Sequence, residues 1–216
     1  MRLMAEGLSA KRGEDLIFND ISFILDASEA LVVTGPNGSG KSTLLRVLAG
    51  LLRPESGHLK LENGPPEIAH PSELSHYLGH RNAMKRELTV AENLSFWRDF
   101  MGDSPGARGA TLTEAVEAVG LPDIAHLPFG YLSAGQQRRM AMAKLVIAYR
   151  PIWILDEPTA ALDAGADRLF ADLVKAHLGK GGIVIAATHQ PLGLDRTKEL
   201  HMTGFEHLAG DRWHDA

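Results

Sequence analysis

The stretch Gly35-Pro36-Asn37-Gly38-Ser39-Gly40-Lys41-Ser42-Thr43 decides the fold of this chain. It fits G-x-x-x-x-G-K-[ST], the pattern of a P-loop whose backbone N–H groups surround the phosphates of ATP. An apolar run over residues 31–33 precedes it and a helical pattern follows, which is the strand-to-helix setting that a P-loop requires. Lys41 is expected to reach the β- and γ-phosphates, and Ser42 to hold Mg²⁺. The alternative is a glycine-rich turn that binds no ligand.

A second element suited to phosphate is Leu132-Ser133-Ala134-Gly135-Gln136, a Ser/Gly turn that opens a helix. Backbone N–H groups and the helix dipole at such a turn favour an anion. One domain with one nucleotide has no need of two such elements. We therefore expect the second element to contact the nucleotide of a neighbouring chain, so that the working unit is a dimer.

Two carboxylates, Asp156 and Glu157, directly follow the apolar run Ile152–Leu155. Ligands of open α/β sheets bind at the carboxyl ends of the strands, so these acids should lie beside the P-loop. Neighbouring residues on a strand point to opposite faces, which predicts a division of roles. Asp156 would assist Mg²⁺ and Glu157 would act as the general base for water. The alternative is a pair of surface acids after a strand.

Two further polar residues follow predicted strands. His189 comes after the run Ile183–Ala187, at the same expected sheet edge, where it could hydrogen-bond the γ-phosphate. Asp163 could lie between two subunits, although it would serve equally well as the N-cap of a helix that begins at Ala164.

Composition restricts the class of protein. The chain has 216 residues, 44% of them hydrophobic, which is enough for one large domain. The formal charge is −5 and no block of like charge occurs, so nucleic acid is not the expected partner. No cysteine is present, which excludes disulfides and thiolate sites. The apolar runs are too short to span a bilayer, so any membrane role is expected to come through a partner.

Strands alternate with helices along most of the chain, which predicts an α/β fold with a mostly parallel sheet. Strands are expected at residues 2–9, 21–25, 30–34, 58–61, 152–155 and 183–187, and helices at 41–52, 90–101, 111–119, 134–149 and 164–177, with a short strand-rich tail. The helical stretch that starts near His80 interrupts this alternation. We expect it to form a helical subdomain, at about residues 80–140, inserted into the P-loop core.

The P-loop, Leu-Ser-Ala-Gly-Gln, Ile-Leu-Asp-Glu-Pro, Ala-Leu-Asp and Thr-His, in this order and spacing, resemble the nucleotide-binding domain of an ABC ATPase. The resemblance covers the whole chain, so residues 1–216 are expected to form one ABC ATPase domain with an N-terminal antiparallel β part. It implies that Ser133 and Gly135 contact the γ-phosphate held by a partner chain's P-loop. ATP and Mg²⁺ would be the cofactors of a homodimer that closes on ATP and opens after hydrolysis.

Two positions depart from the usual ABC pattern. Arg12 stands where an aromatic residue usually stacks on adenine, and a guanidinium plane can still stack on a base. His80 stands where a glutamine usually ligates Mg²⁺ and reports to the membrane subunit. An imidazole could ligate there, so His80 is a possible additional Mg²⁺ ligand.

The stretches Tyr77-Leu78-Gly79-His80, Lys85–Thr89 and Glu92–Leu94 resemble the ATP-binding subunits of cytochrome c maturation systems, the CcmA-type haem exporter ATPases. This resemblance implies a peripheral protein on the cytoplasmic face of the bacterial inner membrane, docked on CcmB-type and CcmC-type subunits. ATP hydrolysis would drive haem export or the release of a haem-loaded chaperone. No haem site is evident, because His201, His207 and His214 fit no single helical face and suit a solvated surface.

Phe96, Trp97 and Phe100 leave two interpretations open: contact with a coupling helix of a membrane partner, or the core of the helical subdomain itself. Other functional classes also remain. An ABC exporter for another substrate would share every motif. A DNA-repair relative would need a coiled-coil or zinc insertion, a translation-factor relative two such domains, and a regulatory module would not need Glu157.

Overall fold

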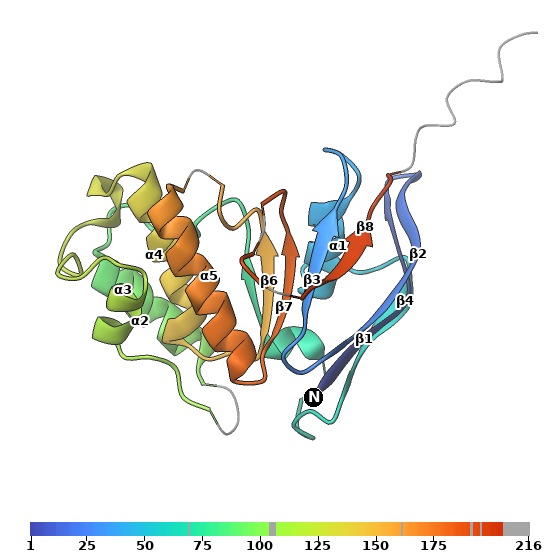
Figure 1. The fold of residues 1–216 in the computed structure, drawn as a ribbon, viewed down its shortest axis with the longest axis horizontal. Coiled ribbons are helices and arrows are strands. Elements are labelled where there is room, and N and C mark those ends of the chain that lie inside the picture. Colours follow the sequence, from blue (N-terminus) through green and yellow to red (C-terminus); the bar gives the residue numbers. More distant parts are fainter. Residues whose placement is uncertain (69, 104–106, 161, 191, 195, 205–216) are drawn as a thin grey trace, which may run out of the picture.

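A five-stranded parallel sheet forms the centre of the molecule (Figure 1). The computed structural model describes residues 1–68, 70–103, 107–160, 162–190, 192–194 and 196–204. All pairs in this sheet are parallel, in the order β5-β6-β7-β3-β8. Its strands are β3 (Ala30–Thr34), β5 (Ser75–Leu78), β6 (Ile152–Asp156), β7 (Ile183–Ala187) and β8 (Lys198–His201).

The two faces of the parallel sheet pack against different layers. On β6, Ile152 and Ile154 point into one apolar cluster, whereas Trp153 and Leu155 point into another. This follows from the alternation of side chains along a strand. All five residues of β6 and of β7 are buried, as expected for parallel strands that are covered on both faces.

A three-stranded antiparallel sheet covers one face, together with helix α1 (Lys41–Leu48). Its order is β2-β1-β4, and in Figure 1 it stands on the side of the molecule away from the other helices. The strands are β1 (Arg2–Arg12), β2 (Asp15–Asp26) and β4 (Ser56–Glu62).

The other face is covered by helices (Figure 1). Capping boxes start three of them, at Thr89, Thr111 and Ser133, where the side chain of each N-cap residue accepts a bond from a backbone N–H three residues later. The helices are α2 (Val90–Met101), α3 (Leu112–Ala118), α4 (Ala134–Ile147) and α5 (Ala164–Gly179), with short 3₁₀ turns η1 (Pro71–Leu74) and η2 (Phe129–Tyr131).

The expected α/β fold with an antiparallel N-terminal part is confirmed, but some boundaries were wrong. Helix α1 ends at Leu48 and not at Leu52, because Gly50 takes a left-handed φ of 69° that closes the helix. Strand β2 begins six residues before Ile21, because it pairs with β1 along its whole length. Strand β5 was not predicted at all, since its four residues owe their extended conformation to pairing with β6.

Candidate nucleotide site

The P-loop joins β3 to α1 and holds its own lysine. Lys41 is only 8% exposed, and its Nζ donates to the carbonyl oxygens of Gly35 (2.7 Å) and Pro36 (2.9 Å). Glycine is required at Gly35, where φ is 136° and an added Cβ would lie 2.1 Å from the Met202 carbonyl oxygen. The loop therefore encloses a cation within a ring of backbone groups, at the first turn of a helix.

Asp156 ends β6 and faces the first turn of α1. Its carboxylate is buried and accepts hydrogen bonds from Ser42 Oγ (3.1 Å) and from the Tyr77 hydroxyl (3.3 Å). Burial raises the pKa of Tyr77, so its phenol keeps the proton that it donates. His80 Nε2 lies 3.6 Å from the same carboxylate. The structure thus brings together three of the residues predicted for Mg²⁺: Ser42, Asp156 and His80.

Glu157 follows in a strained backbone conformation. Its φ is +46°, which is uncommon for a residue with a Cβ. Two backbone hydrogen bonds hold this conformation: the Glu157 N–H donates to the Ala187 carbonyl at the end of β7, and the Glu157 carbonyl accepts from Arg138. The side chain is about a quarter exposed, and Oε1 lies 3.7 Å from His189 Nε2. A strained carboxylate at a sheet edge is an arrangement found at active sites.

Arg138 is a buried residue for which the sequence analysis predicted no function. From the second turn of α4, its guanidinium donates to the carbonyl oxygens of Gly79 (2.8 Å), Glu157 (2.8 Å) and Pro158 (3.0 Å). It therefore links three segments: the loop before His80, the end of β6 and the helix that follows Ser133. The Gln-Gln-Arg-Arg run was visible in the sequence, but the hydrogen-bond partners of Arg138 lie 18 to 59 residues away along the chain.

The second phosphate element opens α4 as predicted. Ser133 is exposed and its Oγ accepts from Gln136 N (3.3 Å), while Gln136 Oε1 accepts from Ser133 N (2.9 Å). Ser133, Gly135 and Asp163 line one cavity of about 400 Å³, to which no P-loop residue contributes. Asp163 is the N-cap of α5, since its Oδ1 accepts from Ala166 N (2.8 Å). The second phosphate element therefore lines a cavity that is separate from the P-loop of the same chain.

The donor set at the carboxyl edge of β6 fits magnesium. Ser42 and Asp156 offer hard oxygen atoms, which Mg²⁺ prefers, and it usually completes its shell with water and substrate phosphates. Within the described ranges, no cluster of three His, Asp or Glu side chains could hold a metal ion. A magnesium ion here would therefore depend on the phosphates of a bound nucleotide.

The predicted base contact, Arg12, lies at the end of the first strand. Arg12 ends β1 at the exposed hairpin turn, where it pairs with Asp15. Ile17 instead reaches the P-loop, because a Cβ at Gly40 would lie 2.7 Å from its Cγ2. Ile17 also lines a cavity of about 230 Å³ with Ser39, and Arg12 is not among the lining residues. Ile17 carried no motif in the sequence, so only the fold reveals it.

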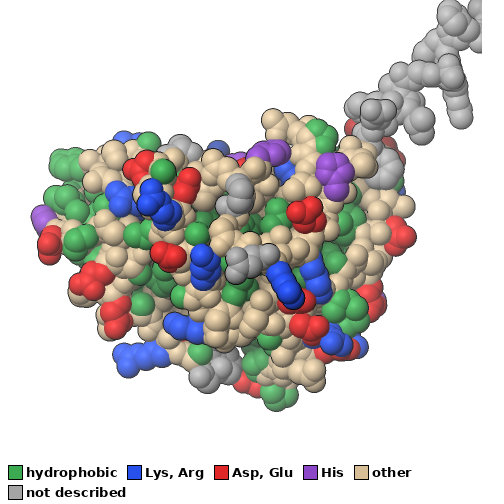
Figure 2. All heavy atoms as spheres, viewed as in Figure 1, with side chains coloured by type: hydrophobic (Ala, Val, Ile, Leu, Met, Phe, Trp, Pro, Cys, Tyr) green, Lys and Arg blue, Asp and Glu red, His purple; other side chains and the backbone are tan. Residues whose placement is uncertain are grey.

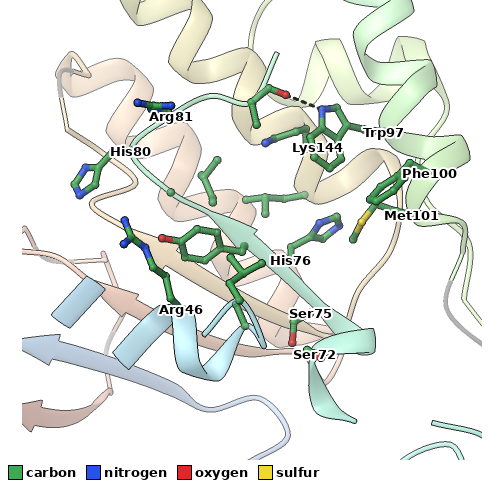
Figure 3. Close-up of a pocket in the computed structure, with 17 residues that line it drawn as sticks. Arg46, Ser72, Ser75, His76, His80, Arg81, Trp97, Phe100, Met101 and Lys144 are labelled. Carbon is green, nitrogen blue, oxygen red and sulfur yellow. Dashed lines mark hydrogen bonds between the residues drawn. The ribbon is translucent and has the colours of Figure 1, made fainter. Parts of the chain in front are cut away.

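A larger cavity, of about 590 Å³, opens between β5 and α2 (Figure 3). We call it the β5–α2 groove. It runs from His80 and Arg81 to Phe100, and Lys144 and Trp97 lie together on one wall. Of the aromatic trio, Trp97 packs against the core, whereas Phe96 and Phe100 are 55% and 68% exposed and stack at 5.8 Å. Contact with a membrane partner stays a prediction for the two exposed rings.

The predicted solvated histidines are only partly described. His201 is exposed on β8 and its Nδ1 lies 3.1 Å from Thr34 Oγ1. His207 and His214 lie outside the described residues.

A family model described as "ABC transporter" matches residues 18–160 of the chain. The chain belongs to the ABC transporter family. It is 77% identical to "Cytochrome c biogenesis ATP-binding export protein CcmA" of Rhizobium meliloti (strain 1021), over 96% of this chain and all of that protein. The predicted ATPase class and the resemblance to CcmA proteins are confirmed.

Solved structures agree on the fold. A putative ABC transporter ATP-binding protein from Pyrococcus furiosus superposes with a TM-score of 0.78 at 21% identity, over 94% of this chain and 98% of that one. A dimeric ATP-binding cassette bound to ADP and Pi superposes with a TM-score of 0.72 at 24% identity, over 87% of this chain and 88% of that one. At these identities the likeness concerns the fold alone.

Proposed function

We propose that the chain is the ATP-hydrolysing subunit of a membrane complex for cytochrome c maturation, and that hydrolysis drives haem export or the release of a haem-loaded chaperone. The observation that carries the ATPase half is the meeting of Ser42, Asp156 and Glu157 beside the P-loop. The haem half is supported by the name of the relative that is 77% identical. Residues 1–216 would act as one ABC ATPase domain, with the helical subdomain at about 80–140.

The chemistry of the site assigns the roles. Residues 35–43 would hold ATP. Lys41 would leave the carbonyls of Gly35 and Pro36 and bind the phosphates. Arg12 or Ile17 would contact the base. Ser42 and Asp156, with His80 in addition, would hold Mg²⁺, which supplies charge neutralisation at the phosphates. Glu157 would take the proton of the attacking water, and His189 would hydrogen-bond the γ-phosphate.

The signature element, Leu132–Gln136, supports a homodimer. Its Ser133 and Gly135 line a cavity on their own chain that contains no P-loop residue, so a phosphate would come from a second copy. Asp163 lines that same cavity and would lie at the subunit boundary. The ATP-binding cassette of the same fold whose structure holds ADP and Pi is dimeric.

The membrane partners would be CcmB-type and CcmC-type subunits, with this chain peripheral on the cytoplasmic face of the inner membrane. None of the helices in the described part of the chain has the length and apolar character to cross a bilayer. The β5–α2 groove is the surface that we assign to these subunits, because it joins His80, beside the Mg²⁺ ligands, to the exposed Phe100.

A nucleic-acid partner receives no support. On the face shown in Figure 2, Lys and Arg side chains are interspersed with Asp and Glu, and the formal charge of the chain is −5. An ABC exporter for a different substrate remains the main competitor, because the substrate is chosen by other subunits.

Complementation tests the haem half. A strain lacking its own CcmA protein would receive the wild-type chain or Glu157→Gln, and covalent haem in c-type cytochromes would be measured by peroxidase staining of gels. We expect haem attachment to return with the wild type only. Restoration by neither, with wild-type ATPase activity intact in the purified complex, would refute the haem pathway and retain the ATPase.

A further inference from the structure

The β5–α2 groove has an exposed rim and a buried floor. On the rim, Leu51 and Phe100 are 63% and 68% exposed. The floor is formed by buried side chains, among them Leu78, Lys144 and Leu145. A recess of this kind, in a cavity of about 590 Å³, has the size of a small-molecule site.

The ionic side chains of the groove are all of one sign. Among the 17 described residues that line it, these side chains are Arg46, Arg81 and Lys144, and none is Asp or Glu. The whole chain has the opposite balance, with 27 acidic and 22 basic residues. A basic recess in an acidic chain favours an anionic ligand.

Lys144 is the buried cation at this floor. It projects from α4, is only 6% exposed and lies next to Trp97 (Figure 3). Within the described residues its Nζ makes no hydrogen bond or ion pair, and it lies 4.6 Å from the centre of the Trp97 ring. Burial, and then the charge of Arg138, lowers the pKa of Lys144 to about 8. A buried ammonium without a carboxylate is costly, so an anion at the floor would remove a cost that the free protein bears.

Aromatic rings border this cation. Trp97 Nε1 donates to the Ala83 carbonyl (2.9 Å), which fixes the indole ring next to the ammonium. Phe100 meets the Trp97 ring edge to face at 5.8 Å, and its own ring is exposed at the rim. An exposed ring beside a fixed cation favours a flat aromatic ligand over a flexible chain, because a rigid ring system loses little conformational entropy when it stacks.

We propose that the β5–α2 groove binds a small, flat aromatic molecule with a carboxylate group, and that this carboxylate pairs with Lys144. The rings would stack on Phe100, and Arg46 and Arg81 would attract the anion into the groove. The inference goes beyond the proposed function, since it concerns a small-molecule ligand of the isolated chain. Its tests of binding therefore need no membrane subunit.

The groove also reaches the candidate magnesium site. Tyr77 and His80 line the groove, and both approach the carboxylate of Asp156, at 3.3 Å and 3.6 Å. None of residues 35–43 is among the described lining residues. A ligand in the groove would therefore not compete with ATP. It would contact two side chains that adjoin a candidate Mg²⁺ ligand, and so would act as an effector of MgATP binding.

Calorimetric titration of the purified chain with pyrene-1-carboxylate, a flat aromatic acid, tests the site. We expect saturable binding to the wild type and a Kd at least about tenfold higher for Lys144→Met, as for the loss of one charge-assisted hydrogen bond. Methionine keeps an unbranched side chain over Trp97, and melting curves would check that the variant folds. Lys175→Met, on the exposed surface of α5, is the matched control and should bind as the wild type.

Related ligands test the same chemistry without a change at Lys144. Pyrene-1-carboxamide lacks the charge and should bind at least about tenfold more weakly than the acid. Decanoate keeps the carboxylate but has no ring, and Phe100→Ala removes the ring on the protein side; each should weaken binding by about threefold or more, as for one aromatic pair. Equal affinity for acid and amide, or of wild type and folded Lys144→Met, would overturn the pairing. Binding of decanoate as tight as that of the aromatic acid would overturn the ligand class.

Titration at rising MgATP concentration separates the groove from the nucleotide site. We expect the Kd of pyrene-1-carboxylate to change by a factor that levels off once ATP saturates the P-loop. A Kd that rises in proportion to the nucleotide would place the probe in the nucleotide site and overturn the proposal, and a Kd that MgATP does not alter would refute the effector role. Failure of the chain to co-purify with membrane subunits, with probe binding intact, would refute the docking of the proposed function and retain this site.

Discussion

Histidines at the two ends of strands β5, β6 and β7 have opposite surroundings. At the carboxyl ends, His80 and His189 are more than half exposed and face the carboxylates of Asp156 and Glu157. At the other end, the Nε2–H of the buried His76 donates to the Ala148 carbonyl (2.6 Å), and the ring of His177 stacks on Trp153 at 3.9 Å. One end is open to a ligand and the other is closed by the protein itself.

This difference separates function from stability. Polar groups whose partners all lie within the chain fix the fold, because breaking any bond exposes a buried donor or acceptor. Polar groups that face solvent at a sheet edge are available to phosphate, metal and water. Substitutions at the open end should therefore change catalysis, and those at the closed end should change stability.

Glu157→Gln should show the largest effect at the open end. The amide cannot take a proton from water, so hydrolysis by the complex is expected to fall about 10²–10⁴-fold. ATP binding should persist, and an ATP-bound dimer should accumulate in size-exclusion chromatography. Glu117→Gln on the exposed surface of α3 is the control. Unchanged phosphate release would refute the general-base role.

Ser133→Arg should rank second, because it blocks the contact with a partner's nucleotide. We expect turnover of the homodimer to fall by about 100-fold, as for the loss of one transition-state donor, while the monomer binds ATP as before. Thr111→Arg removes an equivalent capping box at α3 and costs about 1 kcal/mol of stability, without loss of turnover. Full activity of Ser133→Arg would remove the argument for a shared site.

The buried histidines at the closed end should make the folded protein less stable in acid. Burial lowers the pKa of His76 to about 3, so the unfolded chain takes up a proton below its usual pKa near 6.5 and the folded chain does not. Stability is therefore full above about pH 6.5 and declines as the pH falls toward 3. At pH 5 the loss is about 2 kcal/mol for this histidine.

Urea denaturation of wild type and His76→Asn at pH 7.5 and pH 5 measures the contribution of His76 to the pH dependence of stability. The variant should be less stable at pH 7.5 but should lose about 2 kcal/mol less between the two pH values. His177, whose pKa burial lowers to about 4, contributes a term of the same sign that both proteins keep. An identical pH dependence of the two proteins would contradict the buried, neutral state of His76.

Arg138 connects the two ends. Its guanidinium is buried and bonded within the chain, as the closed-end histidines are, yet it holds the backbone of Glu157 at the open end. Arg138→Lys cannot keep three carbonyl bonds in a planar fork, so the loop at Gly79 and the strained Glu157 should loosen together. We expect kcat to fall about tenfold, on the order of one charged hydrogen bond, with little change in KM for ATP. Arg139→Lys is the matched neighbour, since Arg139 bonds to Gly120 (3.1 Å) instead.

Sequence motifs predicted the open end better than the closed one. Lys41, Ser42, Asp156 and Glu157 belong to patterns whose chemistry depends on local spacing, so the sequence alone predicted that they lie at one sheet edge, as they do. The partners that hold them are distant in sequence: Tyr77 contacts Asp156 from 79 residues away. Strand β5 escaped prediction for the same reason, since only its pairing with β6 makes it a strand.

Substitution of His80 should have the smallest effect on ATP hydrolysis. It also tests whether an exposed histidine at the open end serves the metal or a partner protein. At 3.6 Å from Asp156 Oδ2, its Nε2 can ligate or hydrogen-bond near Mg²⁺, but the carboxylate already has bonds from Ser42 and Tyr77. His80→Gln offers an amide oxygen in place of the imidazole, so KM for MgATP should change by about threefold or less, as for one weak, exposed contact. His80→Ala removes the group and should raise the Mg²⁺ concentration needed for half-maximal hydrolysis, whereas exposed His58→Ala should not. If both His80 variants required the same Mg²⁺ as the wild type while losing stimulation by the membrane subunits, His80 would belong to the groove and not to the metal.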